Sequence, residues 1–197
     1  MNKESRFPAP KKRKAAALDG IDYKITQNMT VADRSGNNEI ERLEALLEQV
    51  TDPEIPVVSI RDLGILRDIS LHAGQVTVTI TPTYSGCPAM STIRADIRQT
   101  LSAAGYDDVR LKQSLSPAWT TDWMTDEGRE KLRAFGIAPP QKSAKGLCAV
   151  VSPGTDVKCP QCGSEQTECI SEFGSTACKA LYRCLHCAEP FDYFKCI

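Results

Sequence analysis

Two short motifs near the end of the chain, Cys159-Pro-Gln-Cys162 and Cys184-Leu-His-Cys187, decide the fold of the C-terminal region. Each CxxC turn can direct two sulfurs at one ion, and two such turns complete the tetrahedral set that zinc prefers. The flanking segments Ala180–Arg183 and Pro190–Phe194 are expected to be strands. We therefore predict a zinc ribbon over residues 153–197, stabilised by its metal because so small a core cannot hold a fold unaided.

The sequence leaves the identity of the ion open. Four thiolates also bind iron or an iron–sulfur cluster. Seven of the nine cysteines crowd into this region, and Cys178 is the best candidate for an additional ligand. A closed set of four cysteines has no open coordination position, so the predicted metal is structural rather than catalytic.

Upstream of the ribbon, the pattern of apolar residues predicts a small α+β domain over residues 38–115. A hairpin is predicted from Gly64–Leu71 and Gln75–Thr81, because the second segment alternates strictly between apolar and polar residues. A helix begins before it at Asn38, an expected N-cap. A second helix, Pro88–Ala104, and a third strand from Val109 to Leu115 follow. The expected order is helix, hairpin, helix, strand.

Two further segments are predicted to differ from these domains. Residues 1–37 are expected to be a disordered tail, because they are polar and basic without an apolar period. Residues 116–152 form a connector with one short helix capped by Thr125, and a flexible hinge at residues 141–146. Trp119 and Trp123 lie just before that helix. They either cover the protein's own core or form a docking face for a partner.

Cys87 is the one chemically distinctive residue of the first domain. It directly precedes Pro88, a favoured first residue of a helix, so it is predicted to be the N-cap of the second helix. The helix dipole there would lower the pKa of the thiol and favour a reactive or metal-binding thiolate. An inert buried cysteine is the alternative. Because neither of the two histidines is close in sequence, cysteine-based hydrolysis is not supported.

Composition and motifs exclude several classes of function. The formal net charge of −1 gives no reason to expect nucleic-acid binding. No apolar run is long enough for a membrane span or a secretion signal, so we expect a cytoplasmic protein with reduced cysteines. The chain has no Glu-x-x-His pair for a di-iron site and no glycine-rich dinucleotide loop. It is therefore not expected to carry an oxygenase or reductase activity of its own.

Three motifs in the first domain resemble the MIP18-like family, also called DUF59. They are Asp52–Ile60, Asp62-Leu63-Gly64 and Gly86-Cys87-Pro88. The resemblance implies a role in assembling or delivering iron–sulfur clusters. On that basis Cys87, with Asp52 and Glu54 on the adjoining loop, is a candidate ligand set for iron or a cluster held briefly for transfer.

The later segments Ser116–Met124, Phe173–Thr176 and Glu189–Phe191 make the chain similar to the D-subunit family of the bacterial ring-1,2-phenylacetyl-CoA epoxidase system. This resemblance implies an accessory protein of aerobic phenylacetate catabolism that assembles or repairs the metal centres of the oxygenase and reductase subunits. The alternative is a purely structural or docking subunit of that complex. One thiol cannot complete a cluster site, so the first hypothesis also predicts a homodimer or a complex with a client.

Overall fold

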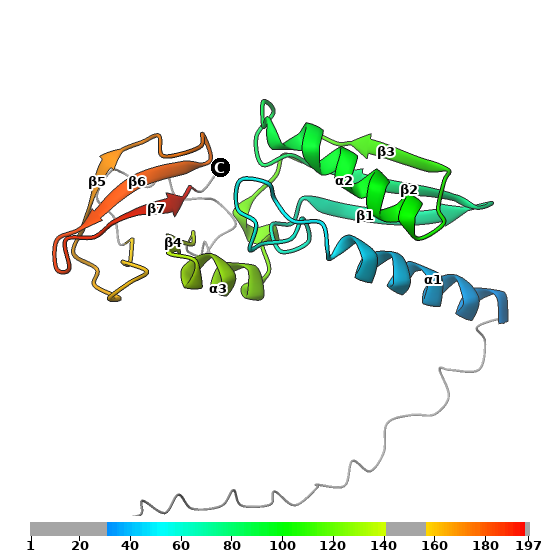
Figure 1. Cartoon of the computed structure of the whole chain (residues 1–197), viewed down its shortest axis with the longest axis horizontal. Helices are drawn as coiled ribbons and strands as arrows, with labels where there is room; N and C mark the ends of the chain where they lie inside the picture. Colours follow the sequence, from blue (N-terminus) through cyan, green and yellow to red (C-terminus); the bar gives the residue numbers. More distant parts are fainter. Residues whose placement is uncertain (1–30, 141–156, 196–197) are drawn as a thin grey trace, which may run out of the picture.

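A three-stranded sheet with two helices packed on it forms the first domain (Figure 1). The computed structural model describes residues 31–140 and 157–195. The elements of this domain are α1 (Val31–Leu47), β1 (Leu66–His72), β2 (Gln75–Ile80), α2 (Ala89–Ala103) and β3 (Val109–Gln113). The strand order is β1-β2-β3, with β1 antiparallel and β3 parallel to β2. The predicted α+β order of helix, hairpin, helix and strand is confirmed.

The hairpin closes through a two-residue turn. Ala73 has φ 49° and Gly74 has φ 83°, so both central residues lie in the left-handed region. Two such residues form the turn whose twist matches that of antiparallel strands. The register that follows pairs His72 with Gln75 and Leu66 with Ile80.

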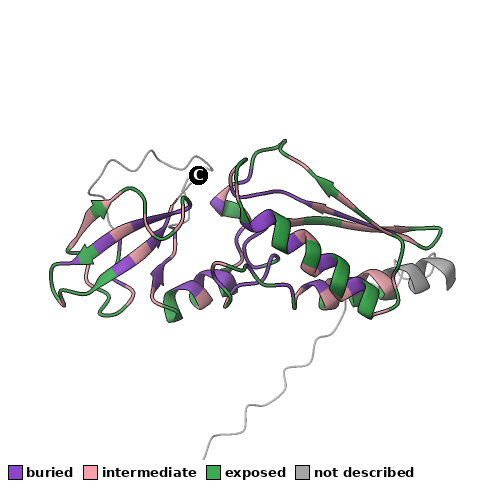
Figure 2. Ribbon diagram, turned by 45° about the horizontal axis from the view of Figure 1, so that its top comes forward, coloured by how far each residue is buried: buried purple, intermediate pink, exposed green. Residues whose placement is uncertain are grey.

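The core of this domain lies between the sheet and the two helices (Figure 2). Ile93, Ile97 and Leu101 recur every four residues along α2 and are fully buried. Leu43 and Leu47 do the same on α1. Burying each such side chain contributes about 1.5–3 kcal/mol, so these two apolar stripes fix how the helices sit on the sheet.

The boundaries of two elements differ from the prediction. Helix α1 begins at Val31, so Asn38 lies inside the helix rather than at its N-cap, and the expected disordered tail does not extend to residue 37. Residues 1–30 lie outside the described residues. Strand β3 ends at Gln113, and Leu115, predicted to continue it, is exposed.

The C-terminal domain is a four-stranded sheet preceded by a short helix. Its elements are a 3₁₀ turn (Thr121–Trp123), α3 (Asp126–Ala134), β4 (Ile137–Ala138), β5 (Thr167–Ser171), β6 (Lys179–Cys184) and β7 (Pro190–Phe194), and the strand order is β4-β7-β6-β5. The predicted cap is present, since the Thr125 hydroxyl accepts the N–H of Gly128 at 2.9 Å. Strand β4 pairs parallel with β7, so the connector supplies a strand of the ribbon sheet, which was not predicted. The hinge expected at residues 141–146 lies outside the described residues.

The two domains share one apolar core. Phe194 of β7 is buried, and its ring centroid lies 6.1 Å from that of Trp119. The Trp119 indole N–H donates to the Leu63 carbonyl at 2.9 Å. We call this contact region the seam; Figure 1 shows that the end of β7 and the start of β6 face the loops of the first domain there.

A buried carboxylate fastens α3 to the first domain close to the seam. Asp62 accepts hydrogen bonds from the Ser59 N–H, the Thr125 hydroxyl and the Lys131 ammonium at 2.9, 3.1 and 2.8 Å. Burial alone would raise the pKa of Asp62, but the hydrogen bonds from Lys131 and Ser59 outweigh burial and lower it.

None of the helices that the structure describes is long and apolar enough to cross a bilayer.

Candidate metal centre and thiol site

The four cysteines of the two CxxC motifs converge on one point. Their sulfurs all lie within 4.8 Å of one another, with Cys159 to Cys187 at 3.7 Å and Cys162 to Cys184 at 3.6 Å. A zinc–sulfur bond of about 2.3 Å in a tetrahedron places sulfurs about 3.8 Å apart. A cluster would instead distribute the thiolates over several irons. The donor set therefore fits a single tetrahedral ion.

Backbone hydrogen bonds shape each of the two turns. The Gly163 N–H donates to the Cys159 carbonyl at 2.9 Å, and Gly163 has φ 74°, a conformation that glycine adopts without strain. In the second turn, the Cys187 N–H donates to the Cys184 sulfur at 3.4 Å, and the N–H groups of Cys187 and His186 lower the pKa of the Cys184 thiol. Backbone N–H groups directed at a cysteine sulfur favour its thiolate, the form that binds metal.

Cys178 does not belong to this metal set. It lies immediately before β6, whereas Cys184 is the last residue of that strand. Its sulfur instead lies 3.0 Å from the Thr176 hydroxyl, and the side chain is buried in the core of the first domain. The expectation of Cys178 as an additional ligand of the ribbon metal is therefore not met.

Cys87 is half-buried in the loop between β2 and α2. Pro88 is the N-cap of α2, so Cys87 lies one residue further from the helix than predicted. The predicted lowering of its pKa is wrong. Burial raises the pKa of the Cys87 thiol and the charges of Asp52 and Glu54 add to this, whereas the Ala89 N–H opposes the shift without reversing it.

Asp52 and Glu54 lie close enough to the Cys87 thiol to act on it electrostatically. Asp52 is buried, and its Oδ1 accepts the N–H groups of Glu54 at 2.8 Å and Ile55 at 3.0 Å. Burial raises the pKa of Asp52, and burial together with the charge of Asp52 raises the pKa of Glu54. A thiol and two carboxylates that all resist ionisation form a neighbourhood that favours a cation, because a cation relieves each of these penalties.

Sequence reasoning missed Lys179, a cation that acts on these carboxylates. Its side chain is 5% exposed and its ammonium lies 3.6 Å from Asp192. It also attracts Asp52 and Glu54 across the seam. From sequence alone, a charged residue in a strand is expected to face solvent. Only the packing of the two domains shows that Lys179 is buried.

The two tryptophans have different positions. Trp119 is 4% exposed and lies in the seam, as the core interpretation expects. Trp123 is half-buried, and the Arg67 guanidinium lies 3.5 Å from its ring centroid. Trp119 thus joins the two domains and presents no surface for a partner.

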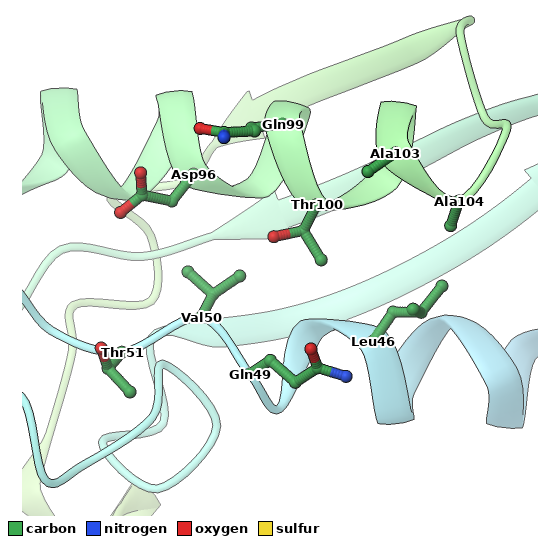
Figure 3. Close-up of a pocket in the computed structure, with 9 residues that line it drawn as sticks. All are labelled: Leu46, Gln49, Val50, Thr51, Asp96, Gln99, Thr100, Ala103 and Ala104. Carbon is green, nitrogen blue, oxygen red and sulfur yellow. The ribbon is translucent and has the colours of Figure 1, made fainter.

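The groove drawn in Figure 3 is separate from both the four-cysteine centre and the loop of Cys87. It has a volume of about 490 Å³ and runs between the end of α1 and α2. Its lining includes Gln49, Thr51 and Gln99, and Asp96 is its one acidic residue. Because no thiol lines it, the groove does not provide the chemistry of the sites above.

Comparisons with known proteins match both domains. A family model described as "Iron-sulfur cluster assembly protein" matches residues 40–110, and one described as "PaaD zinc beta ribbon domain" matches residues 147–195. The chain is 50% identical over 159 residues to a putative D subunit of the 1,2-phenylacetyl-CoA epoxidase of Escherichia coli (strain K12), covering 81% of this chain and 94% of the relative.

Two shorter proteins each match about half of this chain. An "Fe-S protein maturation auxiliary factor" of Porphyromonas gingivalis is 37% identical over 102 residues, which is 49% of this chain and 96% of the relative. A crystal structure of a DUF59 domain from Bacillus anthracis covers 50% of this chain and 95% of its own, with 27% identity and a TM-score of 0.47.

Proposed function

The chain belongs to the D-subunit family of the 1,2-phenylacetyl-CoA epoxidase, and we propose that it matures or repairs the metal centres of the oxygenase and reductase subunits of such a system. An accessory role related to iron–sulfur assembly is the general function that its relatives support. The observation that carries the specific proposal is the Cys87 thiol beside Asp52 and Glu54. A soft thiolate and hard carboxylate oxygens suit a ferrous ion or cluster that is bound and then released.

We assign zinc to the four-cysteine centre and iron to the cargo. Zinc has no redox chemistry and fits the closed tetrahedral set, so it holds the ribbon together without taking part in transfer. The proposed place of action is the cytoplasm, where thiols remain reduced. Metal analysis of the purified chain tests the first assignment, which requires one zinc and no iron in the ribbon.

The deciding experiment measures the iron content and activity of the oxygenase and reductase produced with and without this chain. If the clients are iron-poor without it, and adding it later restores them only when iron and sulfide are supplied, the maturation role holds. If the clients are fully loaded but inactive until the chain is added back, the protein is a docking subunit of the complex, and the proposal fails.

A matched pair of variants isolates the role of the thiol. Cys87→Ser should fold and retain the ribbon metal but fail to restore the iron of the clients. Cys169→Ser removes a half-buried thiol of the ribbon, away from Cys87, and should behave like the wild type. Equal restoration by both variants would remove Cys87 from the mechanism.

A further inference from the structure

A second thiol, contributed by the other domain, belongs to the neighbourhood of Cys87. Cys178 is 5% exposed and is part of the buried core cluster of the first domain, against which Cys87 and Tyr84 also pack. Its backbone carbonyl accepts the Lys195 N–H at 2.9 Å, which ties it to the end of β7 beside Phe194. The packing of the two domains therefore brings a cysteine of the ribbon to the seam.

The same charged groups surround both thiols. Asp52 and Glu54 each act electrostatically on Cys87 and on Cys178. Both thiols also act electrostatically on the Tyr84 hydroxyl. Figure 1 is consistent with this, since the loop after α1, the start of α2 and the start of β6 all lie at the seam. Two thiols and two carboxylates thus lie at the seam, and Lys179 acts electrostatically on Asp52, Glu54 and Cys178.

We propose that Cys178 is the second thiol of the cargo site, so that Cys87 and Cys178 hold one ferrous ion between the two domains, with a carboxylate of the Asp52 loop as a further ligand. This inference rests on the proposed function and names its ligand set. Two thiolates with oxygen ligands suit a divalent transition metal, whereas magnesium and calcium select oxygen alone. A site completed within one chain also removes the need for a homodimer to supply the second sulfur.

The candidate ligands at the seam are less closely grouped than the four ribbon cysteines. Within the described residues, the four ribbon cysteines are the one set of three or more candidate ligands whose atoms lie within 4.8 Å of one another. The two seam thiols lie on loops, between β2 and α2 and between β5 and β6, so binding has to bring both thiols and a carboxylate within coordination distance of one ion. An ion held by loops that must close on it is bound less firmly than one in a preformed set, which suits cargo that is handed on.

Metal selectivity between the two sites allows a direct test with the full-length chain. The protein is first loaded with one equivalent of zinc and then titrated anaerobically with ferrous iron. X-ray absorption at the iron edge then reports only the second site, because the ribbon contains zinc. We expect one iron per chain with two sulfur neighbours in a monomer. A single sulfur neighbour would overturn the proposal even if no variant could be purified.

Three variants complete the test. Cys178→Ser should leave one sulfur neighbour and weaken iron binding by at least about 10-fold, the lower end of what loss of a supporting group around a metal costs. Cys87→Ser should have the same effect, and Cys169→Ser should bind iron as the wild type does. Zinc content and circular dichroism confirm that each variant is folded.

The outcomes separate this inference from the proposed function. If iron binding is lost in Cys87→Ser but unchanged in Cys178→Ser, the thiol pair is wrong and the cargo role of Cys87 stands. Two sulfurs that persist in Cys178→Ser within a dimer would also overturn the pair, because the second sulfur then comes from another chain. If omitting the chain leaves the clients fully loaded, the proposed function itself fails, whatever the iron edge shows.

Discussion

Replacing Asp62 with asparagine should loosen the attachment of α3 to the first domain and destabilise the whole chain. The carboxylate accepts three hydrogen bonds, from Ser59, Thr125 and Lys131, and its side chain is 3% exposed. An asparagine keeps one acceptor oxygen but turns an N–H₂ group toward at least one of these donors. Leaving a buried donor unsatisfied costs about 1–3 kcal/mol. Lys131 is about one-third exposed and can turn to water, so we expect a loss of about 2 kcal/mol.

Urea unfolding of the zinc-loaded chain, followed by the fluorescence of Trp119 and Trp123, measures this loss. Glu127→Gln is the matched control, because it removes the exposed partner of the same Lys131 ammonium, 3.0 Å away. An exposed helix pair contributes about 0.3–0.5 kcal/mol. Equal losses from Asp62→Asn and Glu127→Gln would refute the claim that the buried carboxylate fastens the helix.

The same variant has a defined dependence on pH. The folded protein lowers the pKa of Asp62 below its ordinary value of 3.8. A lowered pKa means that the stabilisation is fully present above that ordinary value and is lost as pH falls through the folded-state pKa. The difference in stability between wild type and Asp62→Asn should therefore be constant from pH 5.5 to 8 and shrink below about pH 4. A difference that grew on acidification would contradict the assigned sign.

Three further outcomes follow from the geometry. Gly64→Ala should lower the free energy of unfolding in urea by about 2–5 kcal/mol, because Gly64 has φ 68° and an added Cβ would lie 2.5 Å from the Trp123 carbonyl oxygen. Gly74→Ala is the control: Gly74 has φ 83° but open space around it, so the loss should be only about 1–2 kcal/mol. Chelation of the ribbon metal should remove hydrogen-exchange protection from β5, β6 and β7 more than from β2, and a uniform loss would contradict separate metal dependence. Ferrous binding should strengthen from pH 6 to 8, because burial raises the pKa of the Cys87 thiol and this thiol must lose its proton to bind iron. Competition with a coloured chelator measures the iron affinity at each pH, and the affinity should depend less on pH in Cys87→Ser.

Features encoded by neighbouring residues were predictable from the sequence. The strict alternation before Ile80, the four-residue spacing from Ile93 to Leu101 and the Thr125 cap all involve local contacts, and the structure contains each of them. The two CxxC motifs were equally predictable, because a CxxC turn fixes both of its sulfurs. The start of α1 was not, since the residues between Val31 and Asn38 include serine and glycine, which have weak helix propensity.

Features that depend on distant residues could not be found in this way. Nothing local in Ile137-Ala138 predicts a strand, because its partner, β7, lies more than fifty residues later. The pKa of Cys87 was predicted from the helix next to it, but burial and the carboxylates of another loop decide its direction. The burial of Lys179 and the location of Cys178 likewise follow from the contact between domains.

The contact between the two domains makes the ribbon part of the proposed cargo site. Strand β6 runs from Lys179, beside the seam, to Cys184, one of the four cysteines of the proposed structural metal site. At about 3.3 Å per residue, the six steps from Cys178 to Cys184 separate the two thiols by about 20 Å. A metal held by Cys184 would thus be too far away to exchange ligands with the seam, yet it would anchor the strand that presents Cys178 and Lys179 there. A ribbon that loses its metal should release both residues from the seam, so loading of the structural site would be a precondition for carrying cargo at the other.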